Sequence, residues 1–80
     1  MIKEDIIKVI KKNILEILED IDENHIDINK SMKDYGANSL DIIEVVSCSM
    51  RELKIKIPRT ELSDVNTIGQ LADKFLEFLE

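Results

Sequence analysis

The stretch NSLDIIEVVSCSMREL, residues 38 to 53, determines how this chain is expected to fold, because it carries an uninterrupted helical pattern. Asn38 is a favoured N-cap residue, and Asp41 three positions later can complete a capping box. Side chains at helical spacing predict one buried face: Ile42, Val45, Val46, Ser49 and Leu53. We therefore expect residues 38–53 to form a helix that packs on the core by this face.

A second, narrower row on the same helix consists of Leu40, Ile43 and Ser47. One helix cannot bury its whole circumference in a chain of 80 residues, so this row should lie nearer to solvent. Ser39 follows the predicted cap, so its hydroxyl is not needed for capping and can point outward. An anionic group attached there would lie at the positive end of the helix. Serine is also common at helix starts on propensity alone, so this residue by itself favours a plain helix start over an attachment site.

Helical patterns flank this segment on both sides. Residues 2–19 carry an amphipathic pattern, with isoleucines at helical spacing: Ile6, Ile10, Ile14 and Ile17. Residues 59–65, RTELSDV, favour a short helix with two inward side chains, Leu62 and Val65. A capping box of Thr67 and Gln70 predicts the start of a last helix. The apolar face of that helix consists of Ile68, Leu71, Ala72, Phe75, Leu76 and Leu79.

The polar stretch EDIDENHIDINKSMKDYGA, residues 19 to 37, is long for a loop in so small a protein. Its apolar residues are spaced like anchors for an irregular segment: Ile21, Ile26, Ile28, Met32 and Tyr35. At the far end of the central helix, Ile57 precedes Pro58 and is disfavoured in the α region, so we expect this pair to end the helix. The segment LKIKIP is too brief to support a sheet. The prediction is an all-α fold, a small four-helix bundle of three main helices and a short third helix, with a long loop after the first.

Length and composition narrow the classes of function. Eighty residues predict a single domain, residues 1–80. The net charge of −6 and the pI of about 4.7 argue against nucleic acid and against an anionic membrane as partners. Aromatic residues make up only 4% of the chain, so the stacking platforms of single-strand binders are missing. No segment has membrane-spanning length and the N-terminus alternates apolar and charged residues, so we expect a cytoplasmic protein without a signal peptide.

The acidic loop contains one pattern that could suggest a metal site. Asp20, Asp22 and Asn24 stand at alternate positions, as in the opening of a calcium loop. A calcium loop then requires Gly at its sixth position and Glu at its twelfth, where this chain has His25 and Ser31. Because the two most diagnostic positions fail, we interpret the segment as a solvated acidic loop and expect no metal.

Catalytic constellations are equally weak. Cys48 is the only cysteine, and its pairing with His25 would lack a third residue to orient the base. Gly36 and Gly69 are isolated, so no glycine-rich phosphate cradle is present. We expect no catalytic residue and interpret Cys48 as a small residue at the edge of the core.

Several stretches together resemble a known family. DYGANSLDIIEVV, residues 34 to 46, resembles the prosthetic-group attachment motif of acyl carrier proteins, usually written as Asp-Ser-Leu after a glycine. LKIKIP and TIGQLADKFLEFL are similar to the family's Ile-Pro segment after the second helix and to its last helix. The resemblance covers essentially the whole chain. It implies that Ser39 carries 4′-phosphopantetheine, transferred from coenzyme A by a phosphopantetheinyl transferase.

The resemblance implies a carrier that performs no chemistry itself. Its arm would hold acyl groups as thioesters and deliver them to several enzymes, so that local concentration replaces diffusion. The family's partners read mainly the second helix, which here offers an apolar row and flanking charges: Leu40, Ile43, Ser47, Asp41, Glu44 and Arg51. No further apolar stripe remains exposed, so we expect a monomer.

The chain also departs from the family's pattern. Asn38 replaces the acid beside the attachment serine, which keeps the cap and removes a charge. Where fatty-acid carriers usually place acids, this chain has Met50 and Arg51, followed by a basic segment at residues 54–59. Charge pattern tunes partner choice, so we expect partners other than ordinary fatty-acid synthase enzymes.

GANSLD, IPRTEL and NTIGQLAD are similar to free-standing carriers of polyketide assembly lines. They are most similar to donor carriers that supply acetyl or malonyl units for β-branching. In that pathway a hydroxymethylglutaryl (HMG) synthase-like enzyme takes the acetyl group, and acyltransferases and ketosynthases are further implied partners. The alternatives are a carrier for fatty-acid synthesis or for aminoacyl groups and, in a different class, a small helical interaction module without a prosthetic group.

Overall fold

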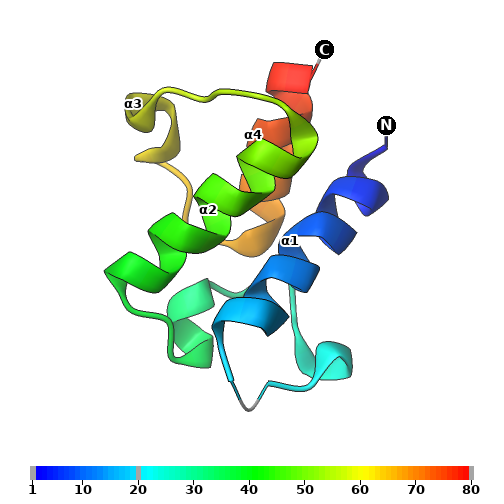
Figure 1. The fold of residues 1–80 in the computed structure, drawn as a ribbon, viewed down its shortest axis with the longest axis vertical. Coiled ribbons are helices and arrows are strands. Elements are labelled where there is room, and N and C mark those ends of the chain that lie inside the picture. Colours follow the sequence, from blue (N-terminus) through cyan, green and yellow to red (C-terminus); the bar gives the residue numbers. More distant parts are fainter. Residues whose placement is uncertain (1, 20, 80) are drawn as a thin grey trace.

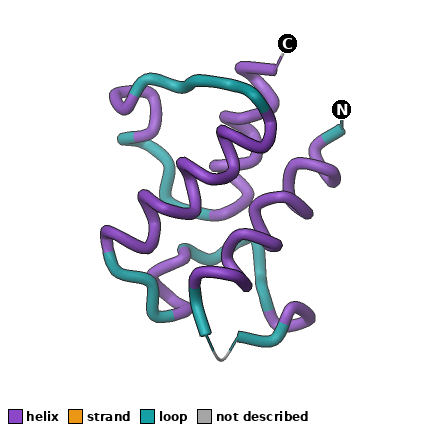
Figure 2. The backbone as a smooth tube through the Cα atoms, viewed as in Figure 1, coloured by secondary structure: helices purple, strands orange, loops and turns teal. Residues whose placement is uncertain are grey.

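The computed structural model describes residues 2–19 and 21–79, and within them it contains helices and no strand (Figures 1 and 2). The α-helices are α1 (Lys3–Ile17), α2 (Ser39–Leu53), α3 (Arg59–Leu62) and α4 (Ile68–Leu79). Two short 3-10 helices, η1 (Glu23–His25) and η2 (Met32–Tyr35), lie between α1 and α2. The predicted all-α bundle of three main helices and one short helix is therefore confirmed. None of the described helices has the length and apolar character needed to cross a membrane.

The core lies where the three main helices meet. Helix α1 packs against both α2 and α4, and α3 contacts α4 (Figure 1). The largest fully buried apolar side chains come from all three main helices: Ile6, Ile10, Ile14, Val45, Ile68, Leu71 and Phe75. Removing each from water stabilises the fold by roughly 1.5–3 kcal/mol before conformational entropy is counted. The apolar stripes predicted for the helices are thus the surfaces that make the core.

The long connection between α1 and α2 is held on the bundle, as its spacing of apolar residues predicts. Ile26 and Met32 are buried, and Ile21, Ile28 and Tyr35 pack against the core. The Tyr35 hydroxyl accepts a hydrogen bond from the Asp27 N–H (2.6 Å) and donates one to the His25 carbonyl (3.1 Å). These contacts order a polar segment that has too few apolar residues to fold by itself.

The connection also docks on the start of α4. The N–H groups of Ile68 and Gly69 donate to the carbonyls of Lys30 (3.0 Å) and Ile28 (2.8 Å). A Cβ atom at position 69 would lie 3.2 Å from the Ile28 carbonyl oxygen, so glycine permits this close approach. The predicted box at the same helix end is confirmed: the Gln70 N–H donates to Thr67 Oγ1 and the Thr67 N–H donates to Gln70 Oε1, both at 3.1 Å.

The prediction that Ile57 and Pro58 end the second helix is wrong, because the helix ends before them by another turn. Helix α2 ends at Leu53, because Lys54 takes the left-handed conformation with φ 58°. The Lys54 N–H bonds the Arg51 carbonyl (3.2 Å) and the Ile55 N–H bonds the Met50 carbonyl (3.0 Å), which is a Schellman ending. Pro58 instead precedes α3 as its N-cap residue, a position where its missing N–H costs nothing.

The bounds of the first helix and the role of the acidic loop differ from the sequence-based predictions. The first helix covers Lys3–Ile17 instead of residues 2–19, because Ile2 and Leu18 are extended flanking residues. In the acidic loop, Asp20 lies outside the described residues, and the Asp22 side chain accepts a hydrogen bond from the Asn24 N–H (3.0 Å). Asp22 therefore serves as the N-cap of η1.

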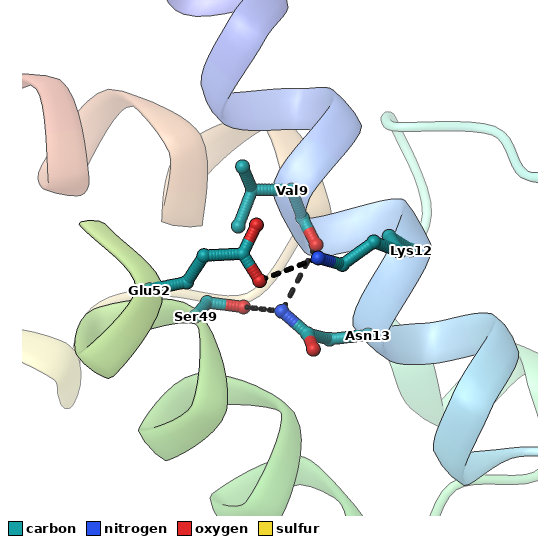
Figure 3. A network of polar contacts seen from close by, with 5 residues as sticks. All are labelled: Val9, Lys12, Asn13, Ser49 and Glu52. Carbon is teal, nitrogen blue, oxygen red and sulfur yellow. Dashed lines mark hydrogen bonds and ion pairs between the residues drawn. The ribbon is translucent and has the colours of Figure 1, made fainter.

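One buried polar contact joins α1 to α2 (Figure 3). Asn13 Nδ2 donates to Ser49 Oγ and to the Val9 carbonyl, each at 3.0 Å. Beside it, Lys12 Nζ binds Glu52 Oε1 at 2.7 Å at the exposed edge of the same interface, and this hydrogen bond raises the pKa of Lys12. Ser49 was predicted to lie on the buried face of α2. Its hydroxyl is buried there and is hydrogen-bonded to a polar side chain, Asn13, on the facing helix α1.

Candidate functional site

The site begins at the turn that leads into α2. Gly36 ends η2 with φ +88°, a left-handed conformation that favours glycine, and Ala37 is buried behind it. Asn38 is extended; its Oδ1 accepts the Asp41 N–H (2.8 Å), and Asp41 Oδ2 accepts the Asn38 N–H (3.1 Å). The predicted capping box is confirmed, and it shows that the Asp41 carboxylate is already engaged at the helix end.

Ser39 is the first residue of α2 and is exposed to solvent. In the described part of the chain no side-chain hydrogen bond engages its hydroxyl, because Asn38 and Asp41 complete the cap between them. The first-turn N–H groups and the helix dipole favour an anion at this end of a 15-residue helix. The accessible Ser39 hydroxyl at the start of this helix therefore fits a phosphodiester-linked group.

The outer face of α2 carries the row predicted from periodicity. Leu40 is 77% exposed and Ile43 is 47% exposed, the highest exposures of large apolar residues in this helix, and Ser47 is half-buried. Glu44 and Arg51 are exposed and continue the same face at helical spacing from Leu40. The structure therefore brings together five of the six predicted partner-binding residues, while Asp41 lies in the first turn and is committed to the cap.

A pocket of about 640 Å³ opens beside this row. Its α2 wall consists mainly of apolar side chains: Ile42, Ile43, Val46, Ser47 and Met50. The facing wall comes from the segment after α2 and from α3, and it includes Lys56, Ile57, Arg59 and Leu62. Sequence reasoning missed this pocket, because its walls come from separate segments that no local pattern links. Its size suits a small organic group.

Cys48 and His25 do not form a site. Cys48 is half-buried on α2, whereas His25 is exposed on η1 and lies 3.5 Å from Asp22. In the ranges 2–19 and 21–79, no three His, Cys, Asp or Glu side chains gather closely enough to hold a metal ion.

Comparison with known proteins finds similarity over most of the chain. The family model described as a phosphopantetheine attachment site matches residues 8–75. The polyketide biosynthesis acyl-carrier-protein AcpK of Bacillus subtilis (strain 168) is 37% identical over 73 residues, which cover 91% of this chain and 89% of the relative.

A solved structure is also similar. It is the crystal structure of the HMG synthase of the curacin biosynthetic pathway in complex with an acetyl donor acyl carrier protein. The match has a TM-score of 0.84 and 36% identity, and it covers 94% of this chain and 96% of the matched chain. The resemblance to acyl carrier proteins inferred from sequence is confirmed, and the chain belongs to the family of carrier proteins defined by a covalent 4′-phosphopantetheine attachment site.

Proposed function

We propose that Ser39 is the attachment residue and that the chain carries acyl groups to partner enzymes. The observation that carries this proposal is the exposed Ser39 hydroxyl at the start of α2, next to a cap that makes no use of it. The chain's membership of the phosphopantetheine family supplies the group that such a hydroxyl would hold. In this role the protein is not a catalyst.

The residues around Ser39 have different roles in the proposed carrier function. Asn38 holds the helix end rigid without adding a charge beside a phosphate. When bound, the prosthetic group supplies a terminal thiol on a flexible arm, on which an acyl group is held as a thioester. Leu40 and Ile43 offer exposed apolar contacts to a partner enzyme. The neighbouring pocket offers the acyl end an apolar surface on the same side of α2.

For the pathway, we propose polyketide biosynthesis, with the chain acting as an acetyl or malonyl donor carrier for β-branching. The similarity to AcpK supports the pathway, and the similarity to an acetyl donor carrier in complex with an HMG synthase supports the donor role. The partners would be a phosphopantetheinyl transferase and an HMG synthase-like enzyme, together with an acyltransferase or a ketosynthase. We propose that the carrier is a cytoplasmic monomer.

Intact-mass spectrometry tests the attachment site. The wild-type chain, incubated with coenzyme A and a broad-specificity phosphopantetheinyl transferase, should gain the mass of one phosphopantetheinyl group. Ser39→Ala should gain nothing, and Ser63→Ala, a matched change at another exposed serine, should be modified like wild type. No gain by wild type, or modification of Ser39→Ala, would contradict the proposal.

Loading assays test the pathway. The protein charged with a labelled acetyl group should transfer that group to an HMG synthase-like enzyme, and the label should then be found on the synthase. Efficient acyl transfer to fatty-acid elongation enzymes, without transfer to the synthase, would place the carrier in fatty-acid synthesis instead.

A further inference from the structure

Basic residues are concentrated in the last turn of α2 and in the segment that follows it. Residues 51–59 contain four basic residues and one acid, a net of +3, in a chain whose net charge is −6. The four are Arg51, Lys54, Lys56 and Arg59, and we call them the basic strip. All four are exposed, and none forms an ion pair with any residue in the described ranges. The one acid, Glu52, is already bound to Lys12 at 2.7 Å.

The basic strip is continuous with the candidate docking face. Arg51 shares the outer face of α2 with Leu40 and Ser47. The segment after α2 runs back over the bundle toward α3, so that Lys56 and Arg59 line the pocket beside this face (Figure 1). Although the chain has 17 acidic residues, none of them lines this pocket. A partner that covers Ile43 and the mouth of this pocket therefore also meets Lys56 and Arg59.

The sign of the charge changes along this surface, from negative near Ser39 to positive at the other end of α2. Glu44 lies toward the Ser39 end of α2 and Arg51 lies seven residues further, about 10 Å along the helix axis at 1.5 Å per residue. A partner surface with basic groups opposite Glu44 and carboxylates opposite the strip matches both ends. The reversed orientation would place like charges together at both ends, which is unfavourable. The pattern can therefore determine which way α2 lies on its partner.

We propose that the basic strip docks on a carboxylate-bearing surface of the acyl-receiving partner, an HMG synthase-type enzyme, and orients Ser39 toward its active-site entrance. This inference rests on the proposed carrier function. It assigns to Arg51, Lys54, Lys56 and Arg59 the role of specificity-determining contacts. A partner that is basic over its whole docking surface would be repelled by the strip, so the same residues act against the wrong enzymes.

The test is a charge reversal with a matched control. Arg51→Glu combined with Lys56→Glu alters the strip, and Lys8→Glu combined with Lys11→Glu makes the same change on α1. Each double variant shifts the net charge from −6 to −10. The probe is the curacin-pathway HMG synthase, and stopped-flow fluorescence measures the association rate at several salt concentrations. Thermal unfolding by circular dichroism confirms that each variant is folded.

The strip variant should associate roughly tenfold more slowly at low salt, and its rate should depend less on salt, because rim charges act mainly on association. The α1 variant should stay within about twofold of wild type. The charge-conserving swap Arg51→Lys with Lys56→Arg should retain the wild-type rate, which a purely structural role would not predict.

Each other outcome counts against the proposal. Equal rates for the two reversed variants would overturn the strip's role while leaving the carrier function intact. Faster association of the strip variant would show that the partner is basic at this position. Slower modification of the strip variant by the phosphopantetheinyl transferase, with unchanged synthase association, would assign the strip to recognition by the transferase. Failure of wild type to bind the synthase, in a sample that still accepts phosphopantetheine, would refute the partner class and with it this inference, but not attachment at Ser39.

Discussion

Ser49→Ala should destabilise the fold more than its size suggests, because Ser49 forms the buried polar contact between α1 and α2. Ser49 is 0% exposed and its partner Asn13 is 4% exposed, so water cannot replace the missing hydroxyl. Asn13 Nδ2 keeps its 3.0 Å bond to the Val9 carbonyl but loses its 3.0 Å bond to Ser49. A lost hydrogen bond costs about 1 kcal/mol and a buried unpaired group about 1–3 kcal/mol, so we expect a loss of about 1–2 kcal/mol.

Urea unfolding with linear extrapolation measures this loss, provided that the slope with denaturant is unchanged. Ser47→Ala is the matched control: the same substitution on the outer face of the same helix should change the free energy of unfolding by less than about 0.5 kcal/mol. In a double-mutant cycle, Asn13→Ala and Ser49→Ala should couple by about 1 kcal/mol. Equal effects of Ser49→Ala and Ser47→Ala, together with additive behaviour of the pair, would refute the role given to this contact.

Replacing both partners separates the hydrogen bond from the space that it fills. Asn13→Leu with Ser49→Ala removes the polar groups together and should be nearly neutral, since neither side chain is then left unpaired. A loss as large as that of Ser49→Ala alone would show that packing, not hydrogen bonding, determines stability at this position.

The other predictions concern the surface that leads to Ser39. Asn38→Ala should lower the free energy of unfolding by about 1 kcal/mol and Asn38→Asp should not, because aspartate also accepts the Asp41 N–H; urea unfolding distinguishes the two. Gly36→Ala should cost about 1–2 kcal/mol because φ is +88°, although no atom lies within 4 Å of the added Cβ. Leu40→Ala should change the free energy of unfolding by less than about 0.5 kcal/mol and yet slow acyl transfer to a partner enzyme. Leu53→Ala, in the core, should lower the free energy of unfolding by about 2–5 kcal/mol. Equal stability losses for the two leucines would contradict the assignment of Leu40 to the docking face.

Much of the fold followed from local patterns. The capping boxes at Asn38 and Thr67 were predicted because they join residues three positions apart, and both are present. The buried stripe of α2 was predicted for the same reason, since helical periodicity places its residues on one face. The end of α2 was assigned to Pro58, because the left-handed turn at Lys54 carries no glycine to mark it.

The sequence by itself determined the helices, the N-terminal caps of α2 and α4 and the freedom of Ser39, because each depends on neighbours within one or two turns. Only the tertiary structure decided that Asn13 meets Ser49, that the loop docks on Gly69, and that a pocket opens beside α2. It also decided that Lys56 and Arg59, two basic residues after α2, line that pocket, next to the row predicted as a contact surface. These features join segments far apart in the chain, and packing of the apolar faces is the physical cause that brings them together.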